Sequence, residues 1–94
     1  MKIKGIIWLD EVLEKLVQKH NVQQHEVREV LTGKPRFRFV EKGHRSRENV
    51  YAAMGQTDDG RYLIIFFVHK TDKRALILSA RDMTKAERRL YEAT

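Results

Sequence analysis

Arginine is the residue type in this chain that offers the clearest chemistry, because a guanidinium can hold a phosphate through two parallel hydrogen bonds. It can also stabilise the charge of a pentavalent phosphorus transition state. Arg61 follows Gly60 at the start of an apolar segment, and Arg81 follows the end of another. Arg81, Lys85 and Arg88 are three or four residues apart, so an early helical turn would place them on one side. The alternative is structural: Arg61 and Lys85 are solvated, and Arg88 pairs with a nearby carboxylate. Those carboxylates are Asp82, Glu87 and Glu92.

The four histidines, His20, His25, His44 and His69, do not pair at the spacing of metal ligands. No carboxylate pair clusters beside them, so we expect no metal site. His69 ends an apolar segment beside Lys70 and is the histidine of most interest for catalysis. His20 ends a predicted helix, where an imidazolium interacts favourably with the helix dipole for purely structural reasons. No GxxxxGK, GxGxxG or GxSxG pattern occurs, so we expect neither a nucleotide cofactor nor a serine triad.

Positive charge is concentrated in residues 34–47. This segment holds six Lys or Arg against the single Glu41, a local excess of +5 in a chain whose formal net charge is +6. Such a cluster interleaved with aromatic residues is typical of a surface that binds a polyanion, most commonly nucleic acid. Phe37 and Phe39 alternate with arginines, so we expect both rings to point into the core rather than to stack on bases. The predicted nucleic-acid contacts of the segment are Lys34, Arg36, Arg38, Lys42, Arg45 and Arg47.

The composition describes a small globular protein. The chain has 94 residues, of which 41% are hydrophobic and 34% charged, and it contains no cysteine. We expect one domain, residues 1–94, with a modest core. The lack of cysteine excludes disulfides and thiolate chemistry and fits a reducing compartment. The longest apolar run, residues 62–68, is far shorter than the ~20 residues that span a bilayer. We therefore expect a cytoplasmic protein without a membrane partner.

Three helices are predicted. Residues 9–20 carry apolar side chains at helical spacing, and Asn21 can take the left-handed conformation that ends a helix. Residues 25–31 repeat the pattern, which the sequence Gly-Lys-Pro then stops. Thr84 and Glu87 form a capping box, which predicts a final helix running through Ala93.

Between these helices the apolar period changes to two, which is typical of β-strands. Strands are predicted at residues 36–39, 49–56, 61–70 and 74–80, with hairpin turns at 57–60 and 71–73. Residues 63–68 are apolar on both faces, as expected of a central strand that helices cover on at least part of both sides. The predicted fold class is α+β: two N-terminal helices, a four-stranded antiparallel sheet and a C-terminal helix, with residues 2–7 as a potential fifth strand.

Four segments of the sequence resemble the BrnT toxin family. They are WLDE at residues 8–11, KHNV at 19–22, GQTDDGR at 55–61 and SARDMTKAERRLY at 79–91. They follow the order found in the family and cover nearly the whole chain, and the C-terminal segment is the most specific. Asn21 stands where the family typically has glycine, and Leu9 separates Trp8 from Asp10.

The resemblance implies a RelE-like fold, ribonuclease activity and a cognate antitoxin. Toxins of this type are similar to metal-independent ribonucleases, in which the 2′-hydroxyl of the RNA attacks the adjacent phosphate. By motif, Arg61, Arg81 and Arg88 are predicted to contact the phosphate and stabilise its transition state. Weaker candidates for proton transfer or substrate positioning are Lys19, His20, His69 and Lys85. The basic segment and Lys85 would hold the RNA backbone, and an acidic antitoxin could cover the same surface.

The resemblance favours a toxin that cleaves mRNA and is neutralised by a DNA-binding antitoxin, with operator DNA bound only through that complex. Two alternatives stay open. One is a non-catalytic nucleic-acid-binding module that uses the same basic surface, because related folds can lose activity. The other is a protein whose main role is to form the antitoxin complex and repress its own operon. Salt-dependent binding of uncleaved RNA would favour the first alternative.

Overall fold

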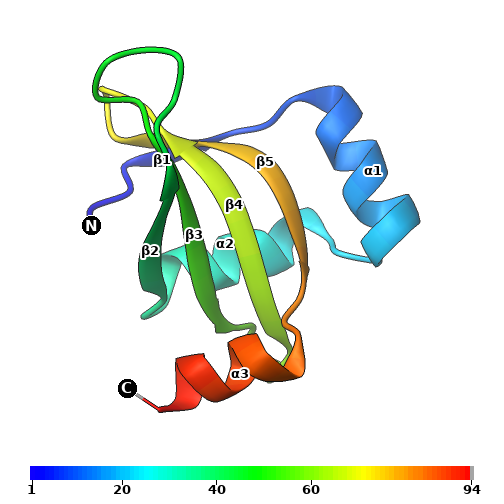
Figure 1. Ribbon diagram of the computed structural model, residues 1–94. Coiled ribbons are helices and arrows are strands. Elements are labelled where there is room, and N and C mark those ends of the chain that lie inside the picture. The colour runs from blue at the N-terminus through cyan, green and yellow to red at the C-terminus, as the bar shows by residue number, and fades with distance from the viewer. Residues whose placement is uncertain (94) are drawn as a thin grey trace.

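The computed structural model describes residues 1–93, which form an α+β fold around one sheet (Figure 1). The elements are β1 (Gly5–Ile7), α1 (Asp10–His20), α2 (Gln24–Thr32), β2 (Arg36–Glu41), β3 (Val50–Gln56), β4 (Tyr62–His69), β5 (Arg74–Asp82) and α3 (Lys85–Glu92). The predicted fold class is confirmed. No helix within residues 1–93 is long and apolar enough to cross a membrane.

The five strands lie in the order β1-β5-β4-β3-β2. Strands β2 to β5 pair antiparallel with their neighbours, as their short connections predict. Strand β1 is shorter than the predicted residues 2–7 and pairs parallel with β5, so the sheet is not wholly antiparallel. Strand β4 is flanked by β5 and β3, which confirms residues 63–68 as part of a central strand.

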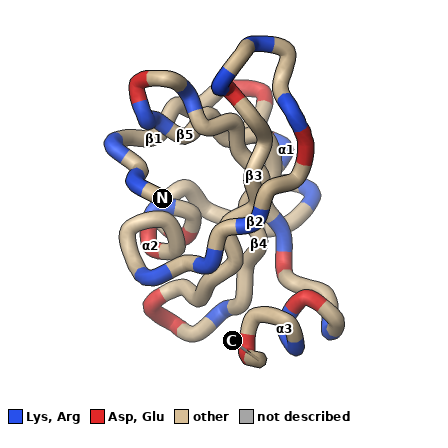
Figure 2. The backbone as a smooth tube through the Cα atoms, turned by 60° about the vertical axis from the view of Figure 1, so that its left-hand side comes forward, with Lys and Arg blue, Asp and Glu red and all other residues tan. Residues whose placement is uncertain are grey.

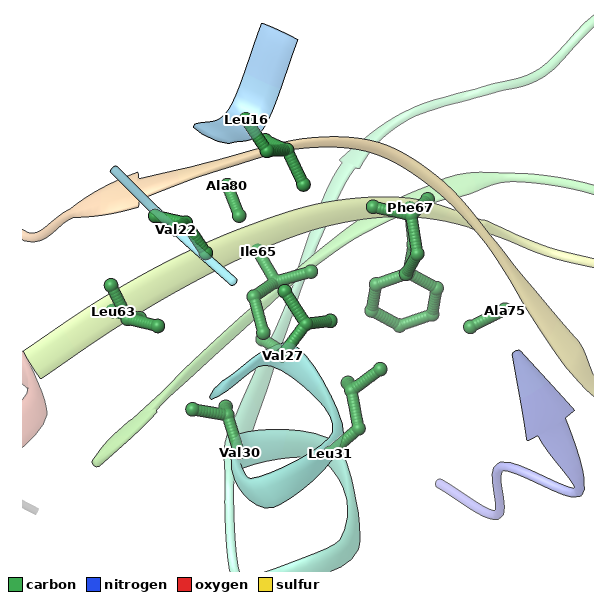
Figure 3. Close-up of a cluster of buried hydrophobic side chains, with 12 residues drawn as sticks. Leu16, Val22, Val27, Val30, Leu31, Leu63, Ile65, Phe67, Ala75 and Ala80 are labelled. Carbon is green, nitrogen blue, oxygen red and sulfur yellow. The ribbon is translucent and has the colours of Figure 1, made fainter. Parts of the chain in front are cut away.

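Helices α1 and α2 pack on one face of the sheet, which we call the helical face. Asn21 ends α1 in the left-handed conformation, with φ 50° and ψ 40°, and the chain turns directly into α2. Leu16 of α1 and Val27 of α2 then bury their side chains against Ile65 and Phe67 of β4 (Figure 3). Together these contacts form the main hydrophobic core and fix the end of α1 close to the sheet.

The opposite face, which we call the open face, carries a smaller apolar cluster. Ala52, Met54 and Ile64 are buried there, and Phe66, Met83 and Tyr91 pack against them. Figure 1 looks onto this face: α2 lies behind the sheet, and α3 runs across the lower end of the strands. Apart from this end, the helices of residues 1–93 leave the open face uncovered (Figure 1).

Phe39 lies outside the core, so the prediction that both rings of β2 are buried is wrong for this residue. Phe37 packs against the main core, but the Phe39 side chain is 57% exposed. Its ring contacts Tyr51 edge-on at 5.9 Å between centroids. Strand β2 is the edge of the sheet, and α2 packs mainly on β3 and β4 rather than on β2.

Candidate active site

A β-bulge in β5 places Arg81 on the open face. Ile77 pairs with Phe67, whereas Ser79 pairs with Phe66, so Leu78 is an extra residue in β5. Side chains of a regular strand alternate between faces, and one extra residue reverses the alternation beyond it. Ile77 and Ala80 are accordingly both buried on the helical face although they are three positions apart. Arg81, opposite Ile64, therefore points to the open face.

The Arg81 guanidinium is held in a defined orientation. Its Nη1 and Nη2 donate to the two carboxylate oxygens of Glu87 at 2.8 and 3.0 Å, and Nη1 also donates to the Asp82 carbonyl at 3.1 Å. The group lies over the ring of Phe66, 5.6 Å from its centroid. Among residues 1–93, Nε–H and the second Nη2–H have no acceptor. These two hydrogens share one edge of the guanidinium, the geometry that binds a phosphate through two hydrogen bonds.

Glu87 is a functional candidate, although its sequence context predicts only a helix cap or a partner for Arg88. Its carboxylate accepts hydrogen bonds from Arg81 and from the backbone N–H of Thr84, at 2.8 Å. Chiefly through the Arg81 hydrogen bonds, the pKa of Glu87 falls from 4.5 to about 2. The same contact raises the pKa of Arg81, which stays a cation at any physiological pH. Arg81 and Glu87 are six residues apart across a strand–helix turn, and no local sequence pattern predicts that they pair. The capping box does predict that Glu87 lies in the first turn of the helix.

Arg88 and its aromatic neighbours lie at the α3 end of the open face. The guanidinium carbon of Arg88 is 3.9 Å from the centroid of the Tyr62 ring, and its Nε is 3.5 Å from a carboxylate oxygen of Glu92. Tyr62 also donates its hydroxyl hydrogen to Glu92 at 3.2 Å. The structural alternative of an Arg88–Glu92 pair is thus confirmed. About half of each side chain is still exposed, so this pair is weak. Lys85, in the first turn of α3, is exposed.

Arg61 joins the α1–α2 turn to the end of the sheet with all five of its N–H groups. It donates to the Asp82 carboxylate at 2.7 and 3.2 Å and to Glu26 at 3.1 Å. The remaining donors reach the carbonyls of His20 and Asn21 at 2.9 and 2.7 Å. The hydrogen bonds from Arg61 lower the pKa of Asp82. Arg61 is therefore not merely solvated, and its predicted role as a phosphate contact stays a prediction that would require breaking these bonds.

The other proton-transfer candidates lie away from Arg81. His69 is on the helical face, where its Nε2 donates to the Lys2 carbonyl at 3.0 Å and its ring contacts Tyr51 edge-on. Lys19 and His20 are at the C-terminal end of α1 on the same side of the sheet. His20 comes near the end of β5, because it interacts electrostatically with Asp82, the neighbour of Arg81 in sequence. None of the three residues contacts Arg81 directly within residues 1–93, and their catalytic roles stay predictions.

The predicted RNA-binding residues fall into two groups. Arg36 and Arg38 lie on β2 beside Met54 and line a hollow of about 320 Å³ next to α3. The guanidinium carbon of Arg36 is 5.7 Å from the Tyr91 ring centroid. The second group belongs to the loop at residues 42–49, at the other end of the sheet (Figure 2). It consists of Lys42, Arg45 and Arg47, all exposed. Lys34 precedes β2 and is also exposed.

Several cations lie on or beside the open face. Within residues 1–93, no three His, Asp or Glu side chains gather closely enough to hold a metal ion. The cations Arg81, Arg88, Arg36 and Arg38 are instead carried by the open face or by α3 at its end. This arrangement can bind a phosphodiester and stabilise negative charge on it.

Comparison with known proteins identifies the family of the chain. Residues 8–87 match the model of a family described as the ribonuclease toxin, BrnT, of type II toxin–antitoxin systems. A search of curated proteins gave no match. The family match covers the bulged strand, Arg81 and most of the sheet. The chain therefore belongs to the BrnT family of ribonuclease toxins of type II toxin–antitoxin systems.

Proposed function

We propose that this toxin is a metal-independent endoribonuclease whose active site lies on the open face around Arg81. Family membership makes it a ribonuclease toxin, which implies an RNA substrate and a cognate antitoxin. The observation that carries the proposal is the free edge of the Arg81 guanidinium, which offers Nε–H and Nη2–H on an uncovered part of the sheet. A single domain contains the whole site.

In the proposed reaction the 2′-oxygen of the RNA attacks the adjacent phosphorus. The bond from phosphorus to the 5′-oxygen breaks, which leaves a 2′,3′-cyclic phosphate and a free 5′-hydroxyl. The proton of the 2′-hydroxyl passes to a base, and an acid protonates the departing 5′-oxygen. Because the pKa of Arg81 is raised by Glu87, Arg81 acts as a fixed cation rather than as a proton carrier. Arg81 binds two phosphoryl oxygens, and Arg88 supplies a second positive charge from α3.

Glu87 serves in this proposal as the residue that positions Arg81. Its two oxygens hold the far edge of the guanidinium, and its own orientation is fixed by the Thr84 cap. A guanidinium held from one edge presents the other without further loss of side-chain entropy when RNA binds. The Phe66 ring below it limits the remaining motion.

The antitoxin is proposed to inhibit by covering the open face and the basic segment. Residues 34–47 carry a charge excess of +5, which complements an acidic partner. Such a partner would exclude RNA directly. Operator DNA would then be bound through the antitoxin and not by this chain alone.

The proposal is tested by incubating the purified toxin with a long defined RNA in EDTA. We expect the wild type to cleave, Arg81→Ala to lose about 10²–10³-fold in rate, and Arg88→Ala to lose less. Arg74→Ala is a matched control, because Arg74 lies on the same strand but pairs with Asp72 away from the site. Equal cleavage by Arg81→Ala and the wild type would contradict the assignment. Binding without cleavage by any variant would instead favour the non-catalytic alternative.

A further inference from the structure

A second hollow lies at the other end of the open face, beneath the loop at residues 42–49. Its volume is about 480 Å³, within the range of roughly 300–1,000 Å³ typical of small-molecule sites. The floor is apolar and is formed by side chains of β3, β4 and β5, namely Val50, Val68, Leu76 and Leu78. The rim is polar and is formed by Glu41, Lys42, His44, Arg45, Glu48 and Lys70.

Contacts within the chain hold the hollow in shape. Glu48 is only 7% exposed and accepts from the Lys70 ammonium at 2.8 Å and from the Thr71 backbone N–H at 3.2 Å. These bonds tie the loop to the β4–β5 turn, and the Lys70 hydrogen bond chiefly lowers the pKa of Glu48. Gly43 passes so close to the Glu48 carbonyl that a Cβ at this position would meet the oxygen at 1.8 Å. These contacts therefore fix the position of the loop above the sheet.

The charge left on the rim is positive. The rim holds three basic side chains, Lys42, Arg45 and Lys70, against the two acidic side chains Glu41 and Glu48, which leaves a net charge of +1. Glu48 forms an ion pair with Lys70 and interacts electrostatically with Arg45 as well. The Lys42 and Arg45 side chains are both exposed beside the apolar floor. An apolar surface flanked by exposed cations fits a nucleotide, whose flat base can cover the floor while its phosphates meet the rim.

The hollow and the Arg81 site lie on one continuous face. Arg81 is opposite Ile64, and Val68 on the floor of the hollow is four residues further along β4. At roughly 3.3 Å per residue the two sites are about 13 Å apart. Phe66 lies between them on the same side of the strand. A single RNA strand bound at Arg81 can thus continue along β4 into the hollow.

We propose that this hollow is a nucleotide subsite, which binds a base and the adjoining phosphates of the RNA some nucleotides away from the scissile bond. This inference rests on the proposed function, because the subsite would bind a further part of the same RNA substrate. Lys42 and Arg45 contact phosphates, and Leu78 contacts the base. Leu78 thereby has two roles. Its side chain contacts the base, and its insertion as the bulge in β5 turns Arg81 to the open face.

The test measures binding of a fluorescent 2′-O-methyl RNA oligonucleotide, which cannot be cleaved by 2′-hydroxyl attack. We expect the double variant Lys42→Ser/Arg45→Ser to reduce the slope of log affinity against log salt by about 1.4, at about 0.7 for each lost phosphate contact on a single strand. We expect Leu78→Ala to weaken binding about threefold to tenfold without changing the slope. Leu78 is 41% exposed, so its truncation leaves the core intact.

The matched control is Lys15→Ser/Arg28→Ser, which removes two exposed cations from α1 and α2 on the other side of the sheet. The subsite would be overturned if the control reduced the slope of log affinity against log salt equally. It would also be overturned if Lys42→Ser/Arg45→Ser and Leu78→Ala both bound RNA as the wild type does. Variants that bind RNA normally but lose the cognate antitoxin would assign the hollow to the protein partner, which also overturns it. Because the oligonucleotide is uncleavable, the result is independent of whether Arg81→Ala abolishes catalysis.

Discussion

Replacing Glu87 with glutamine removes one negative charge and little else. Glutamine has nearly the same shape, and a Thr-x-x-Gln sequence still forms a capping box. The Arg81 contact, however, changes from an ion pair with two hydrogen bonds, at 2.8 and 3.0 Å, into one hydrogen bond from the guanidinium to a neutral amide oxygen. The substitution therefore isolates the contribution of the charged pair to stability and to the position of Arg81.

The size of the effect follows from the pKa of Glu87. Its fall from 4.5 to about 2 corresponds to an upper limit of about 3 kcal/mol. The Arg81 side chain is 34% exposed and that of Glu87 23%, so solvent screening reduces this figure to about 1–2 kcal/mol. A carboxylate with a depressed pKa in the folded state stabilises the protein above its unfolded pKa and loses that contribution as the pH falls through the folded value. The stabilisation is thus complete above about pH 5 and declines toward about pH 2.

Urea unfolding at a series of pH values measures this difference directly. We expect Glu87→Gln to be less stable than the wild type by about 1–2 kcal/mol at pH 7, and the gap to narrow steadily below pH 5. Glu14→Gln is the control, because Glu14 is exposed on α1 and makes no ion pair within residues 1–93. A gap that stays constant with pH would refute the reasoning, since it would trace the loss to packing rather than to charge. In the cleavage assay we expect Glu87→Gln to lower kcat about tenfold through misplacement of Arg81.

Two further substitutions test the parts of the fold that frame the site. Arg61→Ala leaves Glu26 and Asp82 without their shared cation and leaves two carbonyls at the end of α1 without a donor. We therefore expect the free energy of unfolding in urea to fall by about 2–3 kcal/mol. An unchanged urea midpoint would contradict the structural role of Arg61. Gly43→Ala forces a Cβ against the Glu48 carbonyl, so we expect faster amide hydrogen exchange in the loop at residues 42–49 and a lower Tm; unchanged exchange there would show that the loop tolerates the side chain.

The helices and strands could be predicted because their signals are local. The apolar residues of α1 and α2 follow the helical period, those of β4 form a continuous apolar run, and the caps at Asn21 and Thr84 mark helix ends. These features depend on residues a few positions apart, which the sequence displays directly. The parallel pairing of β1 with β5 joins segments about 70 residues apart, and no local pattern carries that information.

The orientation of Arg81 could not be predicted, because it depends on one unpaired residue. In a regular strand, Ile77 and Arg81 would lie on the same face, which would place Arg81 among the core side chains of α1 and α2. The bulge at Leu78 turns Arg81 to the opposite face instead. The position of the bulge is defined only by the pairing of β5 with β4, which the sequence does not display. The burial of Phe39 was wrongly predicted for a related reason, since alternation identifies the side of a strand but not whether anything covers it.

The role of Arg61 also depends on distant partners. Its sequence position, after Gly60 at the start of a strand, favours a solvated side chain, and only the family resemblance predicts a phosphate contact. The structure shows that its partners come from the α1–α2 turn and from the end of β5, up to 41 residues away. The acceptors of the five Arg61 N–H groups come from such distant parts of the chain that only tertiary folding brings them together.

The chemistry of the cleaved RNA ends tests the central claim most directly. Purified wild-type toxin is incubated with a defined RNA in EDTA, and the product termini are identified by mass spectrometry. Attack by the 2′-hydroxyl predicts 2′,3′-cyclic phosphates and 5′-hydroxyls, formed equally with and without the chelator. Products that end in 3′-hydroxyls and 5′-phosphates, or cleavage that appears only after a divalent metal is added, would contradict the account.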